Sequence, residues 1–187
     1  FARIEDDKNI TGFIVPNDPN NGIKLSEEEK KLGIHSSSTR QVFFEKTKVP
    51  IENLLGERNG GFKIAMNALN VGRIKLGAGN LDGQRRVISG AIDYANNRVQ
   101  FKQPISNFDS IKEKIAMMAA SCYAGESSCY RAGSDVQSKI DEYLSNGFSK
   151  QESELKGVEN FAIECSILKV AVSEDMQNCA DEGIQIF

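Results

Sequence analysis

The sequence predicts an α+β protein in which a region of short strands and turns precedes three long helices. Before residue 58, β-branched and aromatic residues occur in short runs bounded by turn-forming residues. After residue 61, apolar residues recur every three to four positions over long stretches, as they do along one face of a helix. The pattern changes at Asn59-Gly60-Gly61, so we divide the chain into residues 1–58 and 59–187.

Three segments organise the first region. Thr11–Val15 is rich in β-branched and aromatic residues, predicts a strand, and ends at the turn-forming cluster Pro16–Gly22. Thr39–Val49 alternates in part, predicts a second extended segment, and ends before Pro50. The short polar segment between them, Ser26–Lys31, is expected to form a helical turn or an exposed loop.

A first long helix is expected from Phe62 to about Val99, because apolar side chains follow one stripe along it. Five glycines lie within this segment, and each costs about 1 kcal/mol of helix propensity relative to alanine. They indicate either the close approach of a neighbouring helix or a break between Gly77 and Gly83. Pro104 ends the segment.

Two further helices follow the same periodicity. One is expected from about Phe108 to Tyr143, and the other from about Ser149 to Glu182, after the Asn146-Gly147 turn. Three long helices joined by short connections make most of an antiparallel bundle.

The composition is that of an ordinary globular protein. The 187 residues are 40% hydrophobic and 26% charged, with a net charge of -3. A chain of this length buries roughly 70% of the surface that its unfolded form exposes. The acidic balance argues against nucleic-acid binding, because proteins that follow phosphate backbones usually carry a basic excess.

The four cysteines are spaced as buried residues of helices rather than as metal ligands or disulfides. Cys122 and Cys129 lie seven residues apart, and Cys165 and Cys179 lie fourteen apart, which places each pair on one helical stripe. The only histidine, His35, is far from all of them in sequence. We therefore expect free thiols, a reducing compartment and no metal site.

Few residues indicate chemistry by themselves. Arg73 and Arg98 each interrupt a helical neighbourhood of apolar or small residues. Such a guanidinium is expected either to pair with a carboxylate or phosphate or to reach solvent from a helix end. Ser36–Thr39 and Asn59–Gly61 could bind an anion, although both are also ordinary turns. No pair of nucleophile and base can be identified.

Eight short segments occur in a distinctive order along nearly the whole chain. They are Thr11–Val15, Lys30–Thr39, Val42–Gly56, Gly60–Met66, Leu69–Arg73, Tyr94–Phe101, Pro104–Phe108 and Gln185–Phe187. Each segment is weakly informative alone, whereas the ordered set is specific. In this order the chain resembles the middle of an acyl-CoA dehydrogenase. Within that family it is most similar to the very-long-chain branch, through Glu29–Ile34 and Asn97–Phe101.

The resemblance implies a fold for both regions. Residues 1–58 would be the second half of a middle β-barrel domain, and residues 59–187 the first three helices of an antiparallel four-helix bundle. The chain would then be a central-to-C-terminal fragment. The strand that stacks on the flavin would precede Phe1 and the catalytic glutamate would follow Phe187, so the 187 residues alone are expected to be inactive.

The resemblance also implies a function. Family members bind FAD and oxidise an acyl-CoA, here a long-chain one, to the trans-2-enoyl-CoA, and electron-transfer flavoprotein accepts the electrons. They form homodimers or homotetramers, and the bacterial cytoplasm and the mitochondrial matrix both fit. Two alternatives stay open from the residues: an acyl-CoA oxidase that uses oxygen, and a non-catalytic member that keeps the bundle as a structural module.

Site residues follow from the positions that match the family's motifs. Asn70, Val71, Gly72 and Arg73 match the segment that lines the thioester end of the substrate pocket, although neither Val71 nor Gly72 can act as a base. Arg98 matches the arginine that reaches the diphosphate of the neighbouring subunit's FAD. The full set of FAD-binding candidates is Arg98, Gln100, Phe101, Phe108, Asp109, Gln185, Ile186 and Phe187.

Three positions depart from the family's usual residues. Asn70 stands where aspartate is common, Lys102 where glycine is usual, and Asp109 where many members have glutamine. A carboxylate would repel a diphosphate, so Asp109 is expected to point away or to be offset by Lys102 or Lys112.

Overall fold

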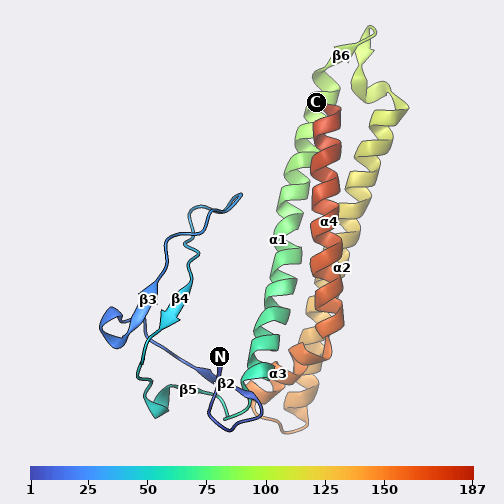
Figure 1. Ribbon diagram of the computed structural model, residues 1–187. Coiled ribbons are helices and arrows are strands. Elements are labelled where there is room, and N and C mark those ends of the chain that lie inside the picture. Colours follow the sequence, from blue (N-terminus) through green and yellow to red (C-terminus); the bar gives the residue numbers. More distant parts are fainter. The chain divides into compact units, whose positions relative to one another are not determined.

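A computed structural model describes all residues, 1–187, and divides into two compact units (Figure 1). The first unit comprises Phe1–Ala65 and the second Met66–Phe187. The first contains short strands and the second contains nearly all of the helical structure. None of the helices combines the length and the apolar character that a membrane span requires.

The first unit is built from two small antiparallel sheets. The sheets have the strand orders β1-β2-β5 and β3-β4. The strands are β1 (Ala2–Arg3), β2 (Ile10–Phe13), β3 (Ile23–Leu25), β4 (Val42–Phe44) and β5 (Leu54–Leu55), with short 3-10 turns at Pro19–Asn21 and Ile51–Asn53.

The strand expected at Thr11–Val15 is present as β2, one residue earlier. The longer extended segment expected at Thr39–Val49 was wrong in length, because only Val42–Phe44 pairs with a neighbouring strand. Lys46, in the left-handed region at φ 54°, ends the extended backbone on one side. On the other side, the Thr39 N–H donates to the Glu28 carboxylate instead of to a strand. Ser26–Lys31 is an exposed loop with no helical turn.

Four helices make up most of the second unit, and the first of them begins in the last residues of the first unit. They are α1 (Gly61–Asn97), α2 (Asp109–Ser145), α3 (Lys150–Asn160) and α4 (Ala162–Ile186). A two-stranded hairpin, β6 (Val99–Gln100) with β7 (Gln103–Pro104), and a 3-10 turn at Ile105–Asn107 connect α1 to α2. Figure 1 shows α1, α2 and α4 lying side by side along most of their length, with the hairpin at the end where α4 finishes.

The first helix is continuous, so its glycines do not mark a break, and two of the five lie close to neighbouring helices. A Cβ atom at Gly77 would lie 3.4 Å from the Leu168 carbonyl oxygen and 3.5 Å from the Cys129 sulfur. A Cβ atom at Gly83 would lie 3.0 Å from the Met176 sulfur. At Gly77 a Cβ atom would make ordinary van der Waals contact, whereas at Gly83 the flexible Met176 side chain would have to shift slightly.

The single third helix expected at Ser149–Glu182 was wrong, because the chain forms two helices there. They meet at Phe161, whose backbone (φ -110°, ψ 27°) leaves the helical region. The preceding residue, Asn160, donates its side-chain amide to the Lys156 carbonyl over 2.7 Å and to the Tyr143 hydroxyl over 3.0 Å. Side-chain hydrogen bonds of asparagine compete with continuation of a helix. Two long helices, one of intermediate length and one short helix therefore replace the three expected.

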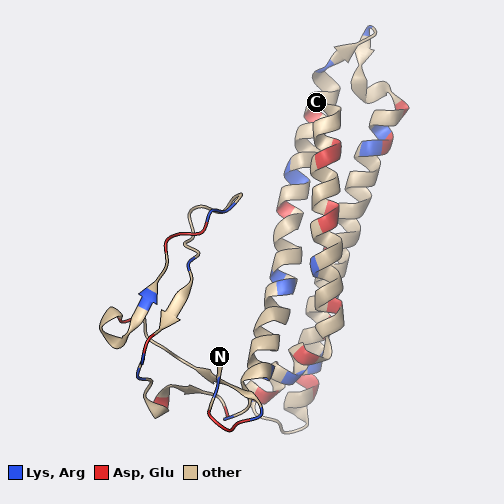
Figure 2. Ribbon diagram, viewed as in Figure 1, with Lys and Arg blue, Asp and Glu red and all other residues tan.

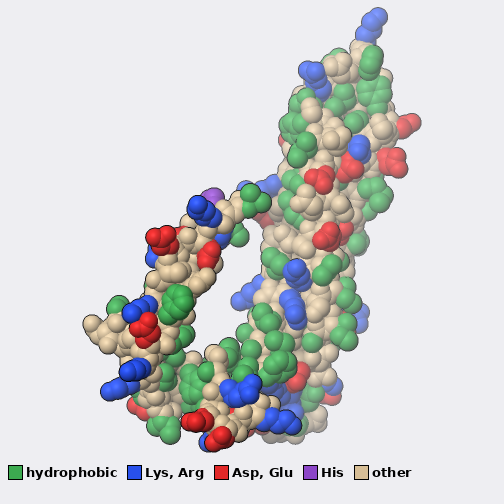
Figure 3. Space-filling model, in the orientation of Figure 1, with side chains coloured by type: hydrophobic (Ala, Val, Ile, Leu, Met, Phe, Trp, Pro, Cys, Tyr) green, Lys and Arg blue, Asp and Glu red, His purple; other side chains and the backbone are tan.

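The core of the bundle consists of two adjacent clusters of buried side chains. One contains Ala91, Ala95, Ile105, Met118, Cys179 and Ile186, and the other contains Leu81, Cys122, Ala132, Leu168 and Val172. Many large apolar side chains nevertheless remain on the surface (Figure 3).

The cysteines are free, as expected from their spacing. Cys122, Cys165 and Cys179 are buried and Cys129 is half-buried. Burial raises the pKa of each of the four thiols, which keeps them protonated near neutral pH and unsuited to act as nucleophiles. No group of three or more histidine, cysteine or acidic side chains is placed to hold a metal ion.

Candidate functional site

The β6–β7 hairpin carries Gln100 and Phe101, two of the residues predicted to bind FAD, and Arg98 directly precedes its first strand. Val99 pairs with Pro104 and Gln100 with Gln103, so Phe101 and its successor form a two-residue loop. Both loop residues have positive φ, as a tight hairpin of this length requires. The Ile105 N–H donates to the Arg98 carbonyl over 2.9 Å, which extends the pairing to the base of the hairpin. The loop is therefore held in one defined conformation.

Aromatic contacts gather further predicted residues at this end of the bundle. The Phe101 ring meets the Phe108 ring edge to face, with centroids 6.2 Å apart. The Phe187 ring stacks on Tyr94 with centroids 4.3 Å apart, and the Tyr94 hydroxyl donates to the Phe187 carbonyl over 3.1 Å. The end of α1, the hairpin, the start of α2 and the end of α4 thus bring together segments that are almost 90 residues apart in sequence.

Two cations of the hairpin have no acidic partner. Arg98 and Lys102 are exposed, and no carboxylate lies within ion-pair distance of either. Asp109 is fully exposed, and its carboxylate pairs with the Lys112 ammonium at 3.2 Å. The expectation that a lysine offsets Asp109 is therefore met by Lys112. In Figure 2 the hairpin carries basic and no acidic segments.

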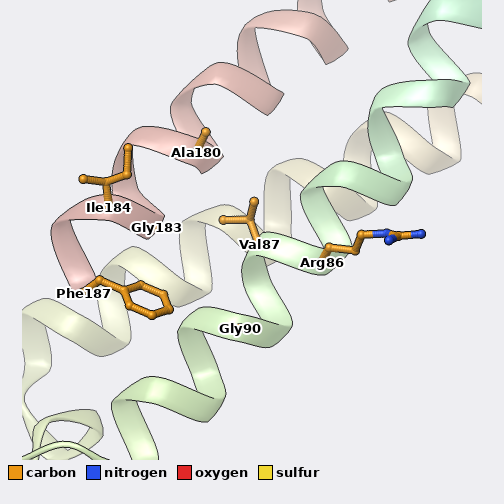
Figure 4. A pocket seen from close by; sticks show the side chains of 7 residues that line it. All are labelled: Arg86, Val87, Gly90, Ala180, Gly183, Ile184 and Phe187. Carbon is orange, nitrogen blue, oxygen red and sulfur yellow. The ribbon is translucent and has the colours of Figure 1, made fainter. Parts of the chain in front are cut away.

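The last three residues of the chain have different surroundings. Gln185 is exposed, whereas Ile186 is buried in the core cluster with Ala91 and Ala95. Phe187 lines an open apolar pocket of about 520 Å³ between α1 and α4, together with Val87 (Figure 4). Ile186 is thus placed to anchor its neighbours and not to face a ligand.

The pocket beside Phe187 offers no reactive group. Gly90, Ala180, Gly183 and Ile184 complete its apolar lining. Arg86 stands at the rim, points away from the Phe187 ring in Figure 4, and pairs with Asp82 one helical turn away. Such a pocket can accept an apolar side chain, and it contains no group for acid–base chemistry.

The segment predicted to line the substrate pocket lies in the first half of α1 and divides between two faces. Asn70 is buried, and its side-chain oxygen accepts a hydrogen bond from Arg73 Nη1 at 2.9 Å. Val71 and Gly72 lie on the exposed face, and a Cβ atom at Gly72 would meet nothing within 4 Å. The structure therefore brings Asn70 and Arg73 together and directs Val71 and Gly72 away from them.

The two groups of predicted residues are far apart within one chain. Arg73 and Arg98 are separated by about 37 Å along the axis of α1 at the usual helical rise. One flavin that binds Arg98 through its diphosphate is too short to reach the Arg73 segment of the same chain as well.

The residues at the hairpin end fit a dinucleotide such as FAD. An unpaired guanidinium suits a phosphate, because its planar donors match two phosphate oxygens. The exposed Phe101 ring offers a surface for a planar group, and Gln100 adds amide donors and an acceptor. The sequence did not predict a role for Tyr94. Its position one helical turn before Arg98 was the only feature that could have indicated one.

Comparison with known proteins identifies the family. The model described as "Acyl-CoA dehydrogenase, C-terminal domain" matches residues 59–187. The chain is 41% identical over 187 residues to a probable acyl-CoA dehydrogenase of Bacillus subtilis (strain 168). This match covers 100% of the chain and 31% of that protein. It is 38% identical over 177 residues to the mitochondrial very long-chain specific acyl-CoA dehydrogenase of Homo sapiens, covering 95% of the chain and 24% of that protein.

A solved structure gives the same result. The crystal structure of an acyl-CoA dehydrogenase complexed with FAD from Bacillus anthracis matches with a TM-score of 0.82 and 44% identity, over 97% of this chain and 31% of that one. The chain thus spans less than a third of the length of these relatives. The predicted resemblance, including its similarity to the very-long-chain branch, is confirmed, and the chain belongs to the acyl-CoA dehydrogenase family.

Proposed function

We propose that the whole protein catalyses the FAD-dependent α,β-dehydrogenation of a long-chain acyl-CoA to the trans-2-enoyl-CoA, and that electron-transfer flavoprotein reoxidises the flavin. The observation that carries this proposal is the unpaired Arg98 guanidinium at the base of the hairpin that carries the exposed Phe101 ring, in a chain of this family. The similarity to the long-chain relative of Homo sapiens supports the long acyl chain.

At the cofactor end, Arg98 would bind the diphosphate of FAD, with Gln100, Phe101 and Phe108 alongside. FAD, when bound, supplies the acceptor for the hydride that leaves the β-carbon. Lys112, which pairs with the fully exposed Asp109 carboxylate, would offset part of its repulsion of the diphosphate. Ile186, fixed in the core, would present Gln185 and Phe187 to the cofactor.

At the substrate end, Arg73 and Asn70 would define the wall near the thioester. Their hydrogen bond fixes the guanidinium in a half-buried position, where its charge acts more strongly than in water. Val71 and the small Gly72 would leave room for the substrate on the outward face. Neither Val71 nor Gly72 carries a group that can remove a proton.

The 37 Å between the two ends supports a homodimer or homotetramer in which each flavin contacts both subunits. Residues 1–58 would belong to a middle β domain and residues 59–187 to the C-terminal helical domain. The bacterial and mitochondrial relatives support a location in the bacterial cytoplasm or the mitochondrial matrix.

The flavin content of variants tests this proposal. Arg98→Ala in the whole protein is expected to weaken FAD binding by about 1.5–3 kcal/mol, the usual worth of hydrogen bonds to a charged group. Arg131→Ala is the matched control, because Arg131 is an exposed arginine of α2 that pairs with Asp135. Absorption of the purified proteins near 450 nm measures the flavin. Equal flavin content in the two variants would refute the assignment of Arg98.

The reaction itself is tested by adding a long-chain acyl-CoA to the flavin-loaded protein without oxygen. Loss of the flavin absorption band is the expected result, because the substrate reduces the cofactor. A flavin band that a long-chain acyl-CoA leaves unchanged would contradict the proposed reaction.

A further inference from the structure

We propose that Lys102 is a second cation for the diphosphate of FAD, carried by the same hairpin that Arg98 precedes, on a loop whose backbone is unfavourable for a lysine. This inference rests on the proposed function.

The backbone of the loop is unusual for its residues. Phe101 has φ 50° and Lys102 has φ 68°, which places two consecutive residues with side chains in the left-handed region. Glycine, asparagine and aspartate usually occupy such positions, because a Cβ atom is unfavourable there. The hairpin would therefore form more readily with glycine or asparagine at position 102. A lysine at a position whose backbone conformation is unfavourable for it indicates a functional role for its side chain.

The hairpin holds this lysine in a fixed region. Backbone pairing of Val99 with Pro104 and the Phe101–Phe108 ring contact tie the loop to the bundle. Only about 13 Å of extended chain separates the Cα atoms of Arg98 and Lys102. Both residues have long side chains, so a guanidinium and an ammonium can reach one anion between them.

The charges of the hairpin match a diphosphate. Residues 98–104 contain two cations and no acidic residue. Neither cation has an ion-pair partner, and the nearby Asp109 carboxylate is occupied by Lys112. A diphosphate within FAD carries two negative charges, so Arg98 would supply directed hydrogen bonds and Lys102 a compact second charge.

Three substitutions in the whole protein separate the charge of Lys102 from its effect on the backbone. Lys102→Gly and Lys102→Asn both remove the charge and suit a left-handed residue, whereas Lys102→Arg keeps the charge. The first two are expected to weaken FAD binding about fivefold, the scale of an exposed ion pair, and the third to retain the original affinity. The dissociation constant is measured by titrating the apoprotein with FAD and following flavin fluorescence.

Two further measurements distinguish a ligand contact from a structural role. The difference between Lys102→Asn and the original protein should shrink when the salt concentration rises from about 0.05 M to 1 M, because salt screens exposed charges. The midpoint of thermal unfolding of the apoprotein should stay equal or rise in Lys102→Gly, since the loop is relieved of an unfavourable conformation. Lys169→Gln, an equal loss of charge at an exposed site on α4, should leave FAD affinity unchanged.

The outcomes separate this inference from the function on which it rests. If Arg98→Ala loses FAD while Lys102→Gly and Lys102→Asn bind it normally, the role of Lys102 is overturned and the proposed function stands. If Arg98→Ala binds FAD normally, the flavin site itself is misplaced. Loss of affinity in Lys102→Arg as well would show that the loop conformation, and not the charge, affects the flavin.

Discussion

The two units of the protein are stabilised by different interactions. Twelve of the thirteen buried hydrophobic side chains lie in residues 66–187, and only Ile23 lies in residues 1–65. In the helical unit, side chains from α1, α2 and α4 form a continuous apolar core. The first unit leaves large apolar residues such as Phe44 and Ile51 exposed, although its chain follows a defined course.

Polar contacts between distant positions define the first unit. The Thr11 hydroxyl accepts a hydrogen bond from the Asn59 N–H over 2.9 Å, and the Asn59 side chain accepts one from the Asn9 N–H over 3.1 Å. Arg58 forms two parallel hydrogen bonds of 2.8 Å with the Asp7 carboxylate. The comparison teaches that the helical unit depends on buried area, whereas the strand unit depends on a few specific bonds.

The largest effect is expected from a cavity in the helical core. Leu168→Ala removes a side chain that is 5% exposed, and it should lower the free energy of unfolding by about 3 kcal/mol, because the vacated space is not refilled. Its neighbour Ile167 is 59% exposed, so Ile167→Ala should change stability by less than about 0.5 kcal/mol. Urea denaturation followed by circular dichroism of the helices measures both. Similar losses in the two variants would show that this unit does not depend on its core as described.

A smaller effect, confined to the strand unit, is expected from loss of one hydroxyl. Thr11→Val keeps the shape of the side chain and leaves the Asn59 N–H without its acceptor, which should cost about 1–2 kcal/mol. Hydrogen exchange of the Asn59 amide should speed up accordingly, while amides in the middle of α2 keep their protection. Thr11→Ser retains the hydroxyl and should retain slow exchange. A Thr11→Val protein with unchanged exchange at Asn59 would contradict the account of this unit.

The smallest effect concerns pH. Hydrogen bonds from Arg58 hold the pKa of the Asp7 carboxyl below its ordinary value of 3.8. A lowered pKa means that the contribution of this pair is present above pH 3.8 and is lost as the pH falls through the lower, folded-state value. In Arg58→Gln the pKa of Asp7 should return toward its ordinary value, as measured by NMR titration.

Glu28 is the control in the same NMR titration. Hydrogen bonds from Ser38, Thr39 and Arg40 lower the pKa of Glu28, and none of them involves Arg58. The pKa of Glu28 should therefore stay low in Arg58→Gln. If the pKa of Asp7 also stays low, Arg58 is not the cause of its shift.

Helices were more predictable from the sequence than strands were. The apolar periodicity located α1 and α2 to within a few residues, since each long helix repeats its pattern many times. The interruption at Phe161 carried no glycine or proline signal, and the Asn160 side chain beside it bonds both to the Lys156 carbonyl and to the distant Tyr143 hydroxyl. Strands such as β1 and β5 are two residues long, too short to show any alternation.

In the candidate site too, some features could be predicted from the sequence and others depend on contacts between distant segments. The order of short motifs was sufficient to predict the family and to single out Arg98 and Arg73. The stacking of Tyr94 on Phe187 and the burial of Ile186 could not be predicted, because they arise where the ends of α1 and α4 meet. The split of the Asn70–Arg73 segment between two faces follows from the helical turn, once the buried face of α1 is known.

The sequence by itself determined the family, the long helices, the free thiols and the residues that are candidates for FAD binding, because these depend on periodicity, spacing and ordered motifs. Only the tertiary structure decided that Lys112 neutralises Asp109, that Arg98 and Lys102 lack acidic partners, and that Lys102 has a left-handed backbone. The physical reason is that charge pairing and strained backbone depend on which side chains and hydrogen bonds meet in space.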